Sequence, residues 1–169
     1  MKEIATMQNQ NQVKYVPAGT GPMYWGPGDK VTFLVTGEQS GGACFIFETM
    51  VPPGGGPPPH LHRHEDESFY LLQGNLTIQA GGRTYQASRG DFIHLPRGIE
   101  HSFKNERNVD ARMIVTASPA GPVGLQKFFE ETFYPATDRS ASPPLATEEL
   151  MGRMKAAVAK HGLEFVHAG

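Results

Sequence analysis

The chain of 169 residues has little cysteine and no large excess of charge of either sign. Its single cysteine, Cys44, cannot form a disulfide within the chain, so nothing in the sequence requires an oxidising compartment. The 15 basic and 17 acidic side chains give a formal net charge of −2. That balance argues against a nucleic-acid backbone or an anionic membrane surface as the main partner. We therefore expect neither nucleic acid nor membrane among its partners.

Long apolar runs are also missing. No stretch approaches the roughly 18 consecutive apolar residues that a membrane-spanning helix needs. The first twelve residues are polar and lack the apolar stretch of a secretory signal. We therefore expect a cytoplasmic location.

Glycine and proline, by contrast, are abundant. The 20 glycines and 14 prolines make up about a fifth of the chain, where about 12% is usual. So many turn residues are hard to place in a helical bundle, but they suit many short strands. Strand-like runs recur about every ten residues, separated by glycine-containing turns, at 31–35, 43–51, 68–72, 76–80, 83–87, 91–95, 101–103 and 111–117. This pattern predicts an all-β antiparallel barrel or sandwich.

The two ends of the chain differ from this central region. Residues 1–30 read as a loop and strand arm. Apolar residues recur at helical spacing within 123–166, where Thr147 is a candidate helix cap and Gly162 a candidate helix stop. We expect one domain over residues 1–169, with a barrel core at about 31–117.

Five of the seven histidines lie between positions 60 and 101. On an extended strand, His60 and His62 point to the same face. Glu67 lies at an odd offset from His60, so it can join them only if the chain bends between 63 and 66. His101 comes from a later strand. Two or three histidines with one carboxylate suit a divalent transition metal.

The spacing of these residues resembles the two sequence signatures of the cupin superfamily. Histidines, a glutamate, glycines, a proline and an asparagine agree with those signatures in identity and spacing. The matching positions are Gly54, His60, His62, Glu67 and Gly74 in the first signature, and Gly90, Pro96, Gly98, His101 and Asn105 in the second.

The resemblance implies a cupin-type jelly roll with short C-terminal helices and one bound metal. Its ligands would be His60, His62, Glu67 and His101, and the metal would be Fe, Ni, Mn, Co, Cu or Zn. Glu67 has two possible roles, metal ligand and general base, and the sequence does not choose between them. Because related cupins are often dimers, the resemblance also implies a homodimer.

A finer resemblance concerns function. The Pro-rich stretch 52–59 leads directly into His60, and with residues 65–74 it resembles bacterial single-domain cupins related to quercetin 2,3-dioxygenase. The tail at 160–165 is similar to their C-terminal helix. The resemblance implies a dioxygenase that consumes dioxygen and acts on a flavonol-like aromatic or enolic hydroxy compound. Two alternatives stay open: a non-oxidative metal-dependent isomerase or lyase, and a small-molecule-binding cupin without enzymatic activity.

Strand alternation also predicts a substrate pocket. Residues two positions beyond Glu67 and His101 share their face. With apolar residues of neighbouring strands they would line an aromatic chamber for a flat, apolar substrate, although plain core filling is the alternative. The five residues are Phe45, Phe47, Phe69, Phe103 and Met113.

Four further polar residues lie near the proposed ligands. His64 is a weak candidate ligand, since it lies beyond the two histidine positions of the signature. We expect His94 in the wall of the site or behind a ligand. Glu65 and Asp66 read as a solvated acidic turn, with the alternative that Asp66 orients a ligand histidine.

Overall fold

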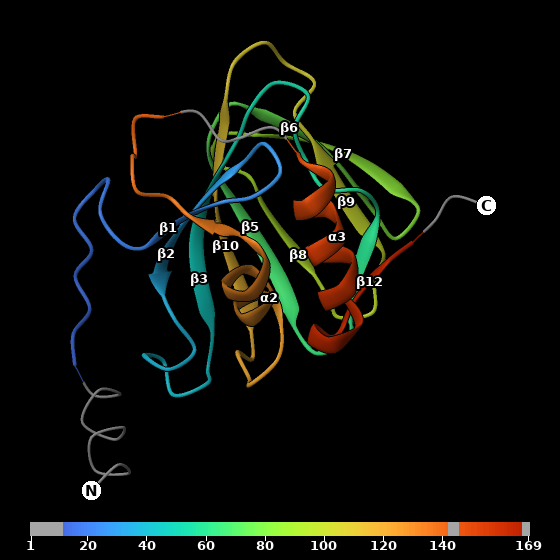
Figure 1. Cartoon of the computed structure of the whole chain (residues 1–169). Coiled ribbons are helices and arrows are strands. Elements are labelled where there is room, and N and C mark those ends of the chain that lie inside the picture. Colours follow the sequence, from blue (N-terminus) through green and yellow to red (C-terminus); the bar gives the residue numbers. More distant parts are fainter. Residues whose placement is uncertain (1–11, 142–145, 167–169) are drawn as a thin grey trace, which may run out of the picture.

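Two antiparallel sheets dominate the computed structural model, which describes residues 12–141 and 146–166 (Figure 1). A seven-stranded sheet has the order β11-β1-β2-β3-β10-β5-β8, and a five-stranded sheet has the order β12-β4-β9-β6-β7. The strands are β1 (Met23–Trp25), β2 (Lys30–Val35), β3 (Phe45–Val51), β4 (His60–His62), β5 (Asp66–Gln73), β6 (Asn75–Ala80), β7 (Arg83–Ser88), β8 (Phe92–Leu95), β9 (His101–Lys104), β10 (Ala111–Ser118), β11 (Tyr134–Pro135) and β12 (Leu163–Phe165). The expected all-β jelly roll is confirmed.

Strand alternation explains where the core lies. Along β3 and β10, every second residue is buried and the residues between are more exposed. The apolar side chains of the two sheets therefore face each other and pack into one cluster. The strand-like runs that the sequence showed between 31 and 117 all correspond to strands.

The structure adds a strand where the sequence predicted a helical tail. A short 3-10 turn, η1 (Ala159–His161), ends at Gly162, and β12 follows. β12 then pairs with β4, with Phe165 opposite His60 and Leu163 opposite His62. The helix stop predicted at Gly162 is confirmed, but the resemblance of residues 160–165 to a C-terminal helix does not hold beyond it. A three-residue strand whose partner lies a hundred residues away leaves no periodicity to read.

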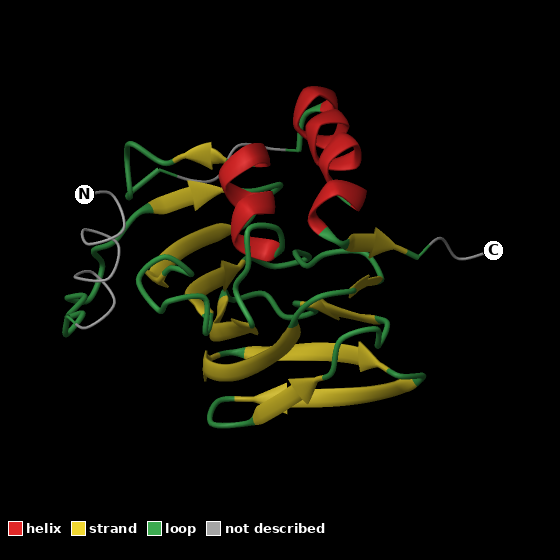
Figure 2. Ribbon diagram, turned by 90° about the horizontal axis from the view of Figure 1, so that it is seen from below, coloured by secondary structure: helices red, strands yellow, loops and turns green. Residues whose placement is uncertain are grey.

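Two helices, α2 (Leu125–Thr132) and α3 (Glu148–Ala157), lie on the same side of the stacked strands (Figure 2). α3 begins as predicted, with the Thr147 hydroxyl accepting a hydrogen bond from the Leu150 amide at 3.1 Å. Gly162 ends the helical segment with a φ of 69°. Within the described ranges, neither helix has the length and apolar character to cross a membrane.

The bend between β4 and β5 brings Glu67 to the inner face. β4 ends at His62 and β5 starts at Asp66. At the bend, the Arg63 amide donates to the carbonyl of Gly162 at 2.8 Å, so the C-terminal segment holds the turn. The predicted bend is confirmed, and the two strands deliver side chains into the same space.

Candidate metal centre and its cavity

Four buried side chains, which we call the His/Glu cluster, meet between the two sheets. They are His60, His62, Glu67 and His101. One nitrogen or oxygen of each lies within 4.8 Å of those of the others. The histidines come from the neighbouring strands β4 and β9, where His60 pairs with His101, and the glutamate comes from β5 in the opposite sheet. The structure thus brings together all four residues that the sequence singled out.

Backbone carbonyls orient two of the imidazole rings. The Nδ1 of His60 lies 2.9 Å from the carbonyl oxygen of Pro58, and the Nδ1 of His101 lies 2.9 Å from that of Ile99. A carbonyl oxygen only accepts, so each Nδ1 carries the proton and donates it. In the neutral rings each Nε2 therefore keeps its lone pair, as metal-binding histidines do.

The free Nε2 lone pairs and the Glu67 carboxylate face one another, and they repel unless a metal cation or a proton lies between them. Glu67 Oε2 lies 3.0 Å from His101 Nε2 and 3.6 Å from His62 Nε2. Among the described residues, neither ring nitrogen of His62 has a hydrogen-bond partner. Ligand atoms that share one metal at bond lengths near 2 Å lie about 3 Å apart. The donor set and its spacing therefore fit a divalent transition metal.

Burial and mutual charge also set the protonation states in this cluster. Burial, followed by the nearby His101 and His62, lowers the pKa of His60 to about 3. Burial opposes ionisation of Glu67, but the facing histidines outweigh it and lower its pKa. Burial likewise opposes the charged form of His62, but Glu67 and then Glu65 raise its pKa. A neutral His60 beside an ionised Glu67 is the state in which both can bind a metal.

Glu65 is a residue that sequence reasoning placed wrongly. Instead of lying in a solvated turn, it is 2% exposed. Its Oε2 accepts a hydrogen bond from the Leu125 amide at 2.8 Å and lies 3.5 Å from His62 Nδ1. The first amide of α2 attracts the carboxylate inward, because the amides of a helix N-terminus lack partners within the helix. The apolar residues at helical spacing within 123–166 were the one signal in the sequence that bore on this contact.

The other polar neighbours lie outside the cluster. Asp66 binds the guanidinium of Arg97 rather than a histidine, and this contact lowers its pKa to about 2. His94 is exposed, with Nδ1 2.9 Å from Ser68 Oγ, so its expected place beside the ligands is wrong. It pairs with Ser68, and strand alternation puts this pair on the face opposite Glu67. His64 is exposed and is not part of the cluster.

A cavity of about 310 Å³ adjoins the cluster, with His60, His62 and Glu67 in its wall. Three of the five predicted pocket residues line it, namely Phe47, Phe103 and Met113.

Phe45 and Phe69 are buried but do not line this cavity. Phe45 is the neighbouring buried residue on the same face of β3, with its ring centroid 4.9 Å from that of Phe47. Phe69 packs edge-on against Phe103 at 5.5 Å. Both rings support the wall rather than form it.

The two helices supply a part of the wall that strand periodicity did not predict. The residues that they contribute are apolar: Leu125, Phe128, Phe129, Met151 and Met154, with Phe133 just after α2. The helices therefore cover the cavity and keep it apolar.

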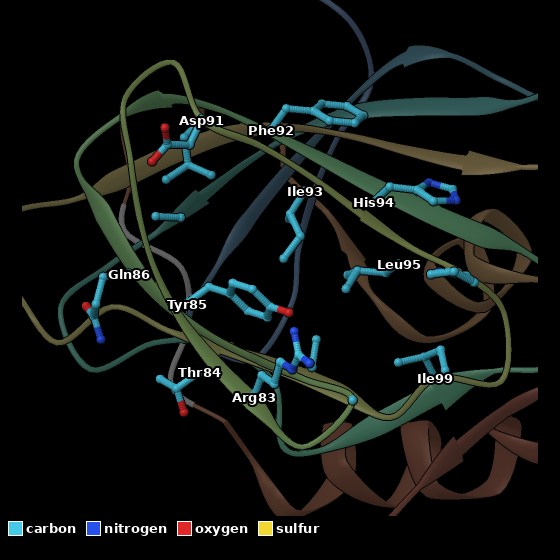
Figure 3. Close-up of a pocket in the computed structure, with 15 residues that line it drawn as sticks. Arg83, Thr84, Tyr85, Gln86, Asp91, Phe92, Ile93, His94, Leu95 and Ile99 are labelled. Carbon is cyan, nitrogen blue, oxygen red and sulfur yellow. The ribbon is translucent and has the colours of Figure 1, made fainter.

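A larger hollow of about 890 Å³ lies between β7 and β8 (Figure 3). Ile93 and Leu95 point into it, and the ring of Tyr85 reaches across it (Figure 3). None of the cluster residues lines this hollow. The smaller cavity is therefore the one connected to the cluster's chemistry.

Comparisons with known proteins agree with this fold. The cupin domain family model (Cupin_2) matches residues 47–117. The tetracenomycin polyketide synthase protein TcmJ of Streptomyces glaucescens is 25% identical over 109 residues, which are 64% of this chain and 73% of that protein. Quercetin 2,3-dioxygenase of Bacillus subtilis is 30% identical over 78 residues, which are 46% of this chain but only 23% of that enzyme.

Among solved structures, the polyketide cyclase RemF from Streptomyces resistomycificus superposes with a TM-score of 0.56 at 21% identity. The superposition covers 82% of this chain and 90% of RemF, and it shows a shared fold. The segment that the cupin domain model matches, residues 47–117, holds all four residues of the His/Glu cluster.

Proposed function

We propose that the protein is a metal-dependent enzyme that acts on an aromatic or enolic hydroxy compound. The observation that carries this proposal is the direct opening of the His/Glu cluster into an apolar, aromatic-lined cavity. His60, His62, Glu67 and His101 would hold one divalent transition metal, the first three of them from the cavity wall. The cavity volume of about 310 Å³ lies at the small end of the range for ligand pockets, which is about 300–1,000 Å³.

A bound metal would supply Lewis acidity, which lowers the pKa of a coordinated hydroxyl. The residues of the chain would do the rest. Phe47, Phe103 and Phe129 hold the flat face of the substrate and exclude water. Glu67, ionised by its histidine neighbours, accepts the proton of the substrate hydroxyl at its carboxylate.

In the first version of this function the protein is a dioxygenase, and dioxygen reacts at the electron-rich carbon of the deprotonated substrate. The similarity to quercetin 2,3-dioxygenase, 30% identity over 78 residues, supports this version. Dioxygen and a flavonol-like substrate would be its partners. We further propose a cytoplasmic homodimer.

The second version is non-oxidative, with the same deprotonation followed by ring closure or isomerisation. The extent of the sequence matches favours this non-oxidative version, since the match covers 73% of TcmJ but only 23% of the dioxygenase. A substrate of polyketide type, which is rich in enolisable carbonyls, suits the same cavity.

Oxygen uptake separates these versions. Metal-loaded protein is mixed with a panel of flavonols, catechols and enolisable β-diketones, with and without oxygen. Uptake with any flavonol or catechol supports the dioxygenase, and equal product formation without oxygen supports the non-oxidative enzyme. The Glu67→Gln variant should lose either activity, whereas the surface variant Glu164→Gln should keep it.

A third outcome would contradict enzymatic function. If an aromatic compound binds tightly to the metal-loaded protein and is recovered unchanged under both conditions, the protein is a small-molecule-binding cupin.

A further inference from the structure

The cavity wall has an uneven distribution of polar groups. Outside the His/Glu cluster, the described wall contains only two residues with polar side chains, Asp29 and Thr49. All its other described residues are apolar or glycine. A polar pair in an otherwise apolar wall fixes the orientation of a ligand.

Thr49 has an unsatisfied hydroxyl. Its side chain is 2% exposed, and within the described ranges its Oγ1 has no hydrogen-bond partner. It lies on the inner face of β3, between Val31 of β2 and Met113 of β10. A buried hydroxyl without a partner costs about 1–3 kcal/mol. A ligand that bonds to it would remove this cost.

Asp29 lies on the same inner face. It immediately precedes β2, two residues before the buried Val31, and it too lines the cavity. Its carboxyl packs beside Gly26, where an added Cβ would stand 2.5 Å from Asp29 Oδ1. Burial raises the pKa of Asp29 to about 6, because its ionised carboxylate has lost contact with water. A hydrogen bond donated by a ligand hydroxyl would therefore stabilise this carboxylate.

Strand register places this pair far from Glu67. On β10, Ala117 lies opposite Glu67 of β5, whereas Met113 lies opposite Thr49 of β3. Four residues of strand separate the two levels by about 13 Å. Between them the wall is apolar, formed by Phe47 and Val115. The cavity thus has a polar end at the cluster, an apolar middle and a second polar end.

We propose that Asp29 and Thr49 form a second polar contact site, which binds a hydroxyl group at the far end of an aromatic ligand. The other end of that ligand carries the hydroxyl that meets the His/Glu cluster. This inference rests on the proposed function for the orientation of the ligand. It specifies the substrate class further, as an aromatic compound with hydroxyl groups at opposite ends.

Two probes of the same ring system test the proposal: 2,6-dihydroxynaphthalene, with a hydroxyl at each end, and 2-naphthol, with one. Their dissociation constants are measured by calorimetry on metal-loaded protein under nitrogen, where no oxidation occurs. Wild-type protein should bind the diol at least about 10-fold more tightly than 2-naphthol. The Thr49→Val and Asp29→Leu variants should each lose most of this preference while keeping the affinity for 2-naphthol.

Exposed residues provide matched controls. Thr84→Val and Asp110→Asn alter exposed side chains and should leave both affinities unchanged. Unchanged affinity for 2-naphthol also shows that Thr49→Val and Asp29→Leu are folded.

The proposal is overturned if wild-type protein does not prefer the diol, or if the preference survives in both variants. Failure of the proposed function would give a different result in the same binding measurements. Removing the metal would then leave the affinity for both probes unchanged, while Asp29 and Thr49 would still distinguish the diol.

Discussion

At the scale of single residues, two adjacent carboxylates beside the cluster have opposite environments. Glu65 is buried between the Leu125 amide and His62, whereas Asp66 faces outward and binds Arg97. Both read alike in the sequence, because a run of charged residues gives no sign of which side chain a distant helix covers. The ligand residues were predictable because their spacing is characteristic, but their supporting carboxylate was not.

The first residue-scale prediction concerns Glu65. Its carboxylate favours a proton on His62 Nδ1, which leaves Nε2 free for a metal. Glu65→Gln keeps an acceptor for the Leu125 amide but loses the negative charge. We expect metal affinity to fall about 10- to 100-fold, measured by competition with a chromogenic chelator. The neighbouring Asp66→Asn should retain wild-type affinity, and equal losses in both variants would contradict the role given to Glu65.

The second residue-scale prediction concerns the effect of Asp29 on the pH dependence of stability. Its pKa is raised from 3.8 to about 6, so the folded protein binds this proton more tightly than the unfolded chain. Stability from this group therefore falls as pH rises from about 4 to 6, and the penalty is complete above 6. Asp29→Asn should be more stable than wild type by about 1–3 kcal/mol at pH 8, with the difference vanishing below pH 4. Urea denaturation at both pH values checks this.

The control for this pH experiment is Asp110→Asn, an exposed site where no such pH-dependent gain is expected. A constant difference between Asp29→Asn and wild type across the pH range would show that the Asp29 carboxyl is not destabilised by burial.

At the scale of elements, the Pro-rich segment before β4 positions His60. The Gly54 amide donates to the Asn105 carbonyl at 2.8 Å, and the Asn105 amide donates to the Gly55 carbonyl at 2.9 Å. These bonds tie the segment to the end of β9, which also carries His101. The two signature segments therefore meet through their backbones as well as through their histidines.

Gly56 is the position in this segment that least tolerates a side chain. Its φ is 131°, and an added Cβ would stand 1.9 Å from the carbonyl oxygen of Phe103. Gly56→Ala should lower the free energy of unfolding by more than about 3 kcal/mol, as strain and a backbone clash combine.

Gly54 is the matched position, with a φ of 77° and no atom within 4 Å of an added Cβ. Gly54→Ala should cost only about 1–2 kcal/mol. Chemical denaturation measures both losses, and similar values would show that the approach of Phe103 does not constrain the segment.

Elements differed in how far the sequence predicted them. The strands between 31 and 117 follow from alternation and glycine turns, and α3 follows from Thr147 and its apolar spacing. β12 did not follow, because three residues are too few to show alternation and its pairing with β4 depends on the rest of the fold. Contacts from distant segments, rather than local preference, decide such elements.

At the scale of the whole molecule, the two sheets and the two helices each supply part of one cavity. The sheets contribute the His/Glu cluster and the inner aromatic wall, and α2 and α3 contribute the apolar cover. Sequence periodicity predicted an aromatic chamber but not this cover, because the apolar stripe of a helix does not tell which surface it packs on.

This arrangement predicts that metal binding stabilises the entire fold. The four cluster residues come from three strands in both sheets, so a bound metal links them only in the folded state. At a hundredfold excess over the dissociation constant, the metal adds about 2.7 kcal/mol. For a chain of this length that raises Tm by about 5–10 °C. The His101→Ala variant should show no such shift when metal is added.

The most direct test of the central claim is elemental analysis of the purified protein, with metal content per chain as the measurement. We expect about one equivalent of a divalent transition metal in wild-type protein and in the surface variant His94→Ala. His62→Ala and His101→Ala should each lose it, because three remaining ligands hold such a metal far more weakly. Full metal content in either of these two variants would contradict the assignment of the His/Glu cluster as a metal centre.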